Sequence, residues 1–430
     1  MKIQQVRIST LCLFCGMTTL QQPGTRSPGL FHSAVIVSAL GFFVDVYDLL
    51  LFGIIRKPSL TDLGLSPDAV LSEGEWLISI QMIGLLIGGI FFGMLGDKKG
   101  RLSVLFGSIL LYSLANILNG FVQNTTQYAV LRFMAGLGLA GELGAGITLV
   151  NELLGKEKRG IASAFIASFG ILGAVAAFFM KEWFSWRTCY FIGGGLGLAL
   201  LLLRSQVMES QMYQSLSHEK HVRKGDFRMF FQQKARAMLY LRCVLIGIPA
   251  WYIIGVLVTF SDQFGKAFGL ENVDPGKAIL YQYMAIAFGD LTAGLLSQWL
   301  KSRKKTLFIF YGITAIFLTL FFTTSGGGSV QHLYWLCAGL GFGTGFTVVY
   351  ITMSAEQFGT NLRATAAVTI PNMVRGALPL ILLLFKGMRT LTGSYVTGAW
   401  ITGVLLMSVA VIAAIGLRES YGRDLDFIEE

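Results

Sequence analysis

The sequence predicts an all-α membrane protein with twelve transmembrane helices, arranged as two pseudo-symmetric six-helix bundles. Three observations lead to this fold class. Of the 430 residues, 54% are hydrophobic and only 13% are charged, which is too apolar for the surface of a water-soluble protein. The apolar residues gather in long runs, most of them sufficient to cross a bilayer. Several motifs of the first half also recur in the second half.

The apolar runs divide the chain into two halves separated by a polar segment. The first six runs cover residues 31–55, 75–95, 102–122, 128–153, 161–180 and 187–203, and the last six cover residues 240–260, 277–300, 307–323, 332–353, 364–385 and 395–417. We therefore expect five parts: an N-terminal tail (1–30), a first bundle (31–204), a linker (205–237), a second bundle (238–417) and a C-terminal tail (418–430). The apolar stretch 8–20 is too short to span. We expect a disordered tail there, or a true start at Met17, rather than a cleaved signal peptide.

The distribution of Lys and Arg predicts the orientation. The loops on the side of Asp97, including the linker, carry more Lys and Arg than the loops on the opposite side. Because cations resist translocation, we expect that side and both termini in the cytoplasm, in a plasma (bacterial inner) membrane. Topology also explains the formal charge of +10, so no nucleic-acid partner is expected.

A short polar segment joins the second and third apolar runs. Residues 93–101 read Gly-Met-Leu-Gly-Asp-Lys-Lys-Gly-Arg. This pattern resembles the signature loop between the second and third helices of the major facilitator superfamily of secondary transporters. The resemblance extends over nearly all of residues 31–417 and implies two bundles that rock about a central cavity. It also implies a gating loop that latches the outward-open state, formed by Gly93, Gly96, Asp97, Gly100 and Arg101.

An internal repeat supports two related halves. Residues 135–138 read Ala-Gly-Leu-Gly and recur as residues 338–341, and a degenerate copy of the loop follows Gly294, which we match to Gly89. In this match Arg132 corresponds to Trp335, so charge at that position is not required by the shared architecture. Such repeats are how many transporters build alternating access around a midplane site.

Away from the ends of the predicted spans, six charged residues lie within the apolar runs: Asp45, Asp48, Arg132, Glu142, Asp290 and Arg375. A charge within the bilayer costs a few kcal/mol and by default marks a substrate or proton path.

The carboxylates of the first half are the expected proton carriers. Asp45 and Asp48 lie three residues apart and share one helix face, so their repulsion favours reversible protonation. Glu142 lies in a glycine-rich run that lets a neighbouring helix pack closely. The alternatives are that Asp48 is solvated or paired with Arg132, and that Glu142 makes a structural hydrogen bond. Arg132 and Glu142 are too far apart on one helix to be partners.

Arg375 is the expected anchor for an anionic substrate. It follows Pro371, which bends a helix, and its guanidinium offers a bidentate grip on a carboxylate or phosphate. The alternative is a structural pair with Asp290. The remaining expected substrate residues are Arg132, Asn372, Tyr47, Trp251, Tyr252 and Tyr281. For the aromatic residues, simple packing or an interfacial belt is the alternative.

Two further segments resemble particular branches of the superfamily. Residues 132–146 resemble the fourth span of the metabolite:proton symporters and of the sialate and monocarboxylate symporters. Residues 41–49 resemble the first span of those proteins and of the phosphate:proton symporters, although Glu142-Leu143-Gly144 departs from the phosphate pattern. We therefore expect a proton-coupled symporter that imports a small organic anion such as a mono- or dicarboxylate.

Other functions stay open on the sequence. A phosphate or zwitterionic osmolyte symporter, a drug:proton antiporter and a non-transporting nutrient sensor share the fold, although residues 170–174 lack the proline of the antiporter signature. An enzyme is not expected, because the four histidines lie at span edges or in the linker. We expect no cofactor and no metal, since the five cysteines form no ligand cluster. The expected partners are substrate, protons and lipid, with the protein acting as a monomer.

Overall fold

The structure is a computed structural model that describes residues 33–99, 101–141, 156–204 and 227–422. Within these ranges it contains helices and no strand. Nine helical stretches of the described chain are long and apolar enough to cross a membrane.

The helices of the first half are α1 (Ser33–Asp62), α2 (Pro67–Lys99), α3 (Arg101–Asn119), α4 (Thr125–Leu139), α6 (Lys156–Trp183) and α7 (Trp186–Arg204). The helices that follow are α9 (Met229–Gln232), α10 (Lys234–Leu245), α11 (Ile248–Tyr252), the π-helix η1 (Ile253–Val258), α12 (Ser261–Ala267), α13 (Pro275–Trp299), α14 (Arg303–Thr324), α15 (Val330–Thr344), α16 (Thr347–Ala355), α17 (Thr360–Gly376), α18 (Leu378–Thr392) and α19 (Tyr395–Ile415). The described parts of the predicted spans lie largely on these helices, while residues 142–153 of the fourth span lie outside the described residues. α9 and the start of α10 fall within residues expected to be linker.

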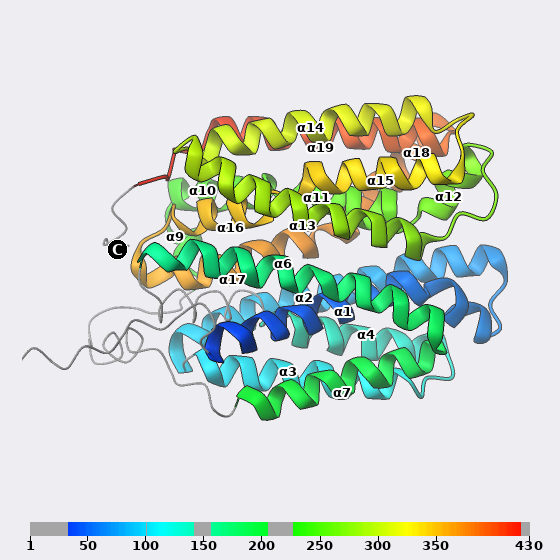
Figure 1. Ribbon diagram of the computed structural model, residues 1–430, viewed down its shortest axis with the longest axis horizontal. Coiled ribbons are helices and arrows are strands. Elements are labelled where there is room, and N and C mark those ends of the chain that lie inside the picture. Colours follow the sequence, from blue (N-terminus) through cyan, green and yellow to red (C-terminus); the bar gives the residue numbers. More distant parts are fainter. Residues whose placement is uncertain (1–32, 100, 142–155, 205–226, 423–430) are drawn as a thin grey trace, which may run out of the picture.

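The two halves lie side by side and meet along two helix pairs (Figure 1). In the first half α1 packs against α6 and α2 packs against α4, while in the second half α13 packs against α15. Between the halves, α2 packs against α17 and α6 packs against α13. These two seams place α2, α6, α13 and α17 along the interface between the halves, and α1 also contacts α13.

Three spans of the second half are broken into consecutive helices, which an apolar run alone does not reveal. Pro249 lies in the first turn of α11, and the π-helix η1 follows directly after Tyr252. Gly345 separates α15 from α16, and Ala377 separates α17 from α18. Proline and π-helical segments disturb the regular ladder of backbone hydrogen bonds, and π-helical turns frequently occur at functional sites.

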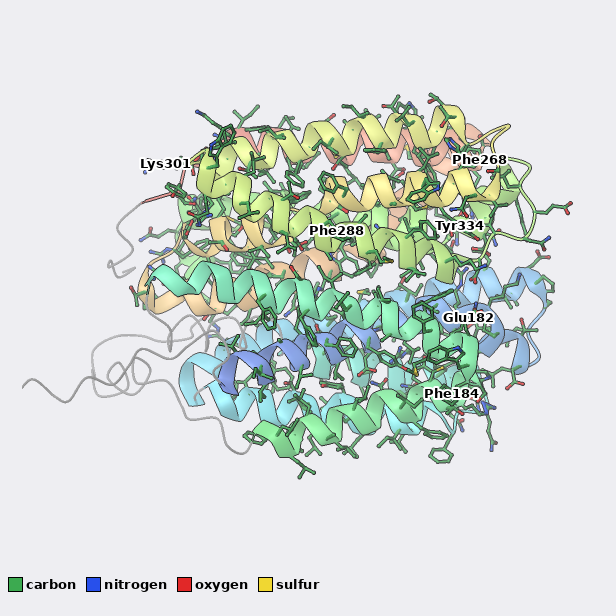
Figure 2. All side chains as sticks on the ribbon, viewed as in Figure 1. Glu182, Phe184, Phe268, Phe288, Lys301 and Tyr334 are labelled. Atoms are coloured by element: carbon green, nitrogen blue, oxygen red, sulfur yellow. The ribbon has the colours of Figure 1, made fainter. Side chains whose placement is uncertain are left out.

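Figure 2 shows the two ends of the molecule. Lys301 lies at one end, and Glu182, Phe268 and Tyr334 lie at the other. We call the end of Lys301 the inner end and the opposite end the outer end, following the expected orientation.

Close helix contacts confirm the internal repeat but correct its register. A Cβ at Gly136 would lie 2.0 Å from the carbonyl oxygen of Gln81, and a Cβ at Gly341 would lie 2.2 Å from that of Gln282. The same pairing recurs where Gly88 meets Leu137 at 2.3 Å and Gly289 meets Phe342 at 2.6 Å. The glycines at which equivalent pairs of helices touch are therefore the equivalent positions of the repeat: Gly136 with Gly341, and Gly88 with Gly289.

In this register the matches made from the sequence motifs are wrong. Arg132 corresponds to Cys337 instead of Trp335, and Gly294 corresponds to Gly93 instead of Gly89. The short motif misled because several small residues follow one another, and only the contact with a neighbouring helix distinguishes them. The absence of a charge at the second copy of Arg132 holds in both registers.

Candidate functional site

Five of the six predicted intramembrane charges belong to the described chain, and all five are buried. Asp45, Asp48 and Arg132 have no exposed surface, Asp290 is 2% exposed and Arg375 is 7% exposed. They come from α1, α4, α13 and α17. Glu142 lies outside the described residues, so its expected role as a proton carrier stays a prediction.

One ion pair joins the two halves at the centre. Nη1 of Arg375 on α17 lies 3.9 Å from Oδ2 of Asp45 on α1. Within the described residues the Arg375 guanidinium has this single ion pair and no hydrogen bond. A separation of 3.9 Å is long for charge-assisted contact, which prefers 2.7–2.9 Å, so the pair is loosely held.

Aromatic side chains of the second half surround Arg375. Its Cζ atom lies 5.8 Å from the ring centroid of Trp251, a cation–π distance. Tyr283 of α13 and Tyr350 of α16 are close enough to interact electrostatically with the guanidinium, and both are buried. A planar cation beside one aromatic ring and two nearby tyrosines is a suitable receptor for a flat anion.

Asp48 and Arg132 form a separate cluster inside the first half. Arg132 Nη2 donates a hydrogen bond of 3.1 Å to Oδ1 of Asn116, and the Arg132 guanidinium lies 5.2 Å from the ring of Tyr190. The positive charge of Arg132 and the side chain of Asn116 both interact with the Asp48 carboxylate. Because Asp48 is fully buried, the alternative that it is solvated is wrong, and its partnership with Arg132 fits the structure.

A glycine makes room for the Asp48 carboxylate. A Cβ at Gly193 on α7 would lie 2.4 Å from Oδ1 of Asp48. Tyr47, the neighbour of Asp48, donates its hydroxyl to the carbonyl of Cys189 at 2.9 Å. Tyr47 thus anchors α1 to α7 within the first half.

Asp290 does not pair with Arg375. Its Oδ1 accepts a hydrogen bond of 3.3 Å from the backbone N–H of Val348, in the first turn of α16. A carboxylate at a helix N-terminus is stabilised by the free N–H groups and by the helix dipole. The structural pair considered from the sequence is therefore not formed, and Arg375 contacts Asp45 instead.

The other predicted substrate residues divide between the seam and more distant packing. Asn372 bridges the halves, because its Nδ2 donates to the carbonyl of Ala140 at 2.7 Å. Tyr252 instead hydrogen-bonds the carbonyl of Ala399 within the second half. Tyr281 stacks on Tyr334 with centroids 5.6 Å apart, in a different cluster from Arg375.

The gating loop is described only in part. Gly93 lies on the seam, where a Cβ would come within 2.9 Å of Thr369 on α17. Gly100 and the side chains of Asp97 and Arg101 lie outside the described part of the chain. α2 continues to Lys99 and α3 begins at Arg101, so residues 96–99, expected to be loop, are helical.

Sequence reasoning missed three residues of the central region and the contacts that join the outer ends. Asn116 and Tyr190 lie beside Arg132, and Tyr350 lies near Arg375. At the outer end, Arg56 pairs with Asp262 at 3.0 Å and Lys181 pairs with Asp274 at 2.8 Å, each across the halves. Opposite charges at the ends of different spans are the only sequence signal for such pairs.

Comparison with known proteins identifies the family. The model of the Major Facilitator Superfamily matches residues 34–378. The chain belongs to the major facilitator superfamily. Together with the all-helical structure, this confirms the predicted fold class of twelve helices in two bundles, and it makes the protein a transporter and not an enzyme.

Relatives within the major facilitator superfamily are bacterial transport proteins. The niacin transporter NiaP of Acinetobacter baylyi is 28% identical over 435 residues, covering 93% of this chain and 97% of that protein. The gentisate transporter of Corynebacterium glutamicum is 25% identical over 378 residues, covering 83% and 82%. The cis,cis-muconate transport protein of Acinetobacter baylyi is 27% identical over 344 residues, covering 77% and 81%.

A solved superfamily structure supports the same fold. The proton:xylose symporter XylE bound to 6-bromo-6-deoxy-D-glucose superposes with a TM-score of 0.70 at 18% identity, covering 91% of this chain and 97% of that chain. The fold of this transporter is thereby shown.

Proposed function

We propose that the protein is a proton-coupled symporter that imports a small organic anion, with an aromatic monocarboxylate as the favoured substrate class. The observation that carries this proposal is the loose, buried pair of Arg375 and Asp45, which joins the two halves. The proposed setting is a bacterial inner membrane with both termini in the cytoplasm and one chain as the working unit.

Charge balance links the proton to the substrate. A buried guanidinium needs a counter-ion, because an uncompensated charge in a low-dielectric site is costly. In the empty protein Asp45 supplies it. When a substrate carboxylate replaces Asp45 as the partner of Arg375, the buried Asp45 carboxyl no longer has this cation beside it, and burial then favours its protonated form. Substrate and proton therefore bind together and leave together, in a ratio of one to one.

The two halves have different parts in this mechanism. Asp45 on α1 carries the proton, while Arg375, Trp251, Tyr283 and Tyr350 of the second half hold the substrate. Because the exchange takes place at the seam, each step alters a contact between the halves. Differential stabilisation of two states by such a contact is the basis of coupling.

Support for the substrate class comes from the aromatic surroundings of Arg375 and from the relatives. Niacin, gentisate and muconate, named for the three relatives above, and benzoate, named for the benzoate transport protein of Acinetobacter baylyi, are all carboxylic acids that are anions at neutral pH. Three of the four carry the carboxylate on one aromatic ring, which suits a guanidinium flanked by Trp251. Glu142 and the Asp48–Arg132 cluster are proposed as further members of the proton path, and residues 93–101 as the inner latch.

The test uses purified protein in liposomes that contain a pH-sensitive dye. Addition of nicotinate or benzoate to wild-type protein should acidify the lumen. Asp45→Asn should abolish this acidification and accumulation driven by a pH gradient, but it should retain exchange of labelled for unlabelled substrate, because the neutral amide mimics the protonated carboxyl. Ser38→Ala, a change of another buried polar residue on α1, is the matched control. Gradient-driven accumulation by Asp45→Asn would contradict the proposal.

A further inference from the structure

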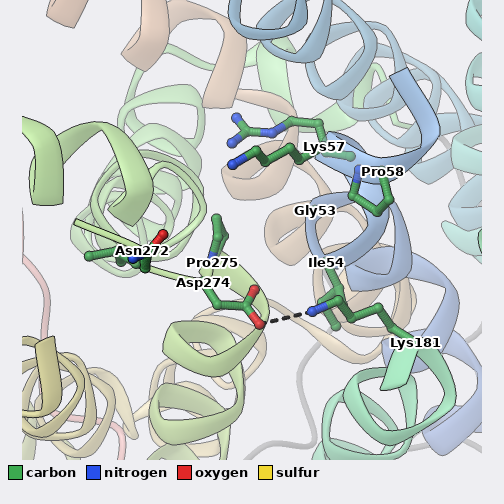
Figure 3. Close-up of a pocket in the computed structure, with 10 residues that line it drawn as sticks. Gly53, Ile54, Lys57, Pro58, Lys181, Asn272, Asp274 and Pro275 are labelled. Atoms are coloured by element: carbon green, nitrogen blue, oxygen red, sulfur yellow. Dashed lines mark hydrogen bonds and ion pairs between the residues drawn. The ribbon is translucent and has the colours of Figure 1, made fainter. Parts of the chain in front are cut away.

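A cavity at the outer end lies between the two halves and is lined by none of the residues of the central site (Figure 3). Its volume is about 270 Å³. α1 and α6 of the first half form one side, and the segment that leads into α13 forms the other. Figure 3 shows Lys57 and Lys181 on the first side and Asn272 and Asp274 on the second.

The lining of this cavity is cationic. Arg56, Lys57 and Lys181 all line it, and Asp274 is the one carboxylate among its lining residues. The side chain of Arg56 is 2% exposed. Its Nη2 pairs with Asp262, but Nε and Nη1 have no hydrogen-bond partner in the described residues. A buried guanidinium with unused donors is an incomplete arrangement that an added acceptor completes.

The same cations hold the outer ends of the halves together. Arg56 on α1 bonds Asp262 on α12, and Lys181 on α6 bonds Asp274, the N-cap of α13. An anion in this cavity would compete with both aspartates for their partners.

We propose that this cavity is an entry site for the carboxylate of the transported anion, bound by Arg56, Lys57 and Lys181 before it reaches Arg375. Binding there weakens the two ion pairs that close the outer ends, so the arrival of substrate favours opening on that side. The entry site rests on the proposed function for its ligand, an aromatic carboxylate.

The dimensions and chemistry of the cavity agree with this ligand. A cavity of about 150 Å³ is enough to bind benzene, so 270 Å³ accommodates one ring with its carboxylate. Lys57 and Lys181 each offer a point charge to the carboxylate, and Arg56 adds a third positive charge among the lining residues. Glu75 of α2 lies within electrostatic reach of Arg56, Lys386 and Arg389, so further cations surround the outer end.

The decisive measurement compares the two sides of the membrane. Initial rates of labelled nicotinate and benzoate transport are measured in right-side-out and inside-out vesicles for Lys57→Gln, Lys181→Gln and the control Lys277→Gln, an exposed cation near the same end. An entry site predicts that the first two variants raise KM from the outer side about tenfold, since a charged hydrogen bond is lost. KM from the inner side and all values for Lys277→Gln should stay unchanged.

A second measurement separates the entry site from the central site. Equilibrium binding of labelled nicotinate and benzoate to purified Arg375→Gln protein reports on the outer cavity alone. Residual binding that disappears when Lys57→Gln is added supports the entry site even if proton symport fails. No residual binding, or an outer KM that Lys57→Gln and Lys181→Gln leave unchanged, overturns the entry site. If wild-type protein shows no substrate-dependent proton movement, the proposed function fails instead.

Discussion

The ion pairs that join the halves differ between the outer end and the centre. At the outer end, Arg56–Asp262 and Lys181–Asp274 are short, 3.0 Å and 2.8 Å, and three of their four side chains keep some exposure above a tenth. At the centre, Arg375–Asp45 is 3.9 Å long and the Asp45 side chain is fully buried. Short ion pairs with access to water suit contacts that break and reform as the outer end opens and closes. A long, buried ion pair suits the exchange of one counter-ion for another.

Removal of the central cation should have the largest effect. Arg375→Gln leaves Asp45 without its ion pair and the substrate without its anchor, so transport of nicotinate and benzoate should fall about 100-fold or more. Arg375→Lys keeps the charge but loses the planar fork, and its activity should be intermediate. Arg389→Lys, a cation that lies 5.5 Å from the ring of Tyr395, is the control. Labelled substrate uptake in liposomes measures all three, and near-normal uptake by Arg375→Gln would refute the central role of the pair.

Reversal of an outer pair should have a smaller effect. Arg56→Asp alone should impair transport, because it places two carboxylates, those of residues 56 and 262, beside one another. Adding Asp262→Arg restores a pair of opposite charges and should recover part of the closure of the outer end. In a background without the native cysteines, spin labels or fluorophores at the outer ends of α1 and α12 report the distance between these helices. The distribution of that distance measures the fraction of protein whose outer end is closed. No recovery in the double variant would show that the pair does not close the outer end.

The smallest expected effect concerns the inner end, where Glu419 follows the last helix. Partial burial acts to raise the pKa of the Glu419 carboxyl, but hydrogen bonds from Ser302 and from the N–H groups of Tyr421, Arg303 and Lys304 outweigh it, so the pKa is lowered. The stabilisation is therefore present at neutral pH and is lost as the pH falls below about 4.

Thermal unfolding of the purified protein at several pH values tests this contact. Glu419→Gln should lower Tm by a few degrees at pH 7, and the difference from wild type should shrink as the pH decreases. Glu271→Gln changes an exposed carboxylate that has no ion-pair partner within the described residues, and it should leave Tm unchanged at every pH. A constant difference across the pH range would mean that charge at Glu419 is not the cause.

Several features of the protein could be predicted from its sequence, because they depend on local composition. The length and polarity of apolar runs reflect the thickness of the bilayer, so the spans were predicted close to the observed helices. The cost of a buried charge made Asp45, Asp48, Arg132 and Arg375 candidates before any contact was known. The loop 93–101 and the resemblance that it carries indicated the superfamily.

Only the tertiary structure decided which charges meet. Asp45 and Arg375 are far apart in sequence, and the choice between Asp45 and Asp290 as partner depends on how α1, α13 and α17 pack. The register of the repeat likewise depends on which glycine touches the neighbouring helix, since Gly136 and Gly341 are equivalent by contact and not by motif. The sequence by itself determined the spans and the charged residues within them, because hydrophobicity acts residue by residue. The pairing of those residues across two halves comes from packing over long sequence separations, which a local pattern does not record.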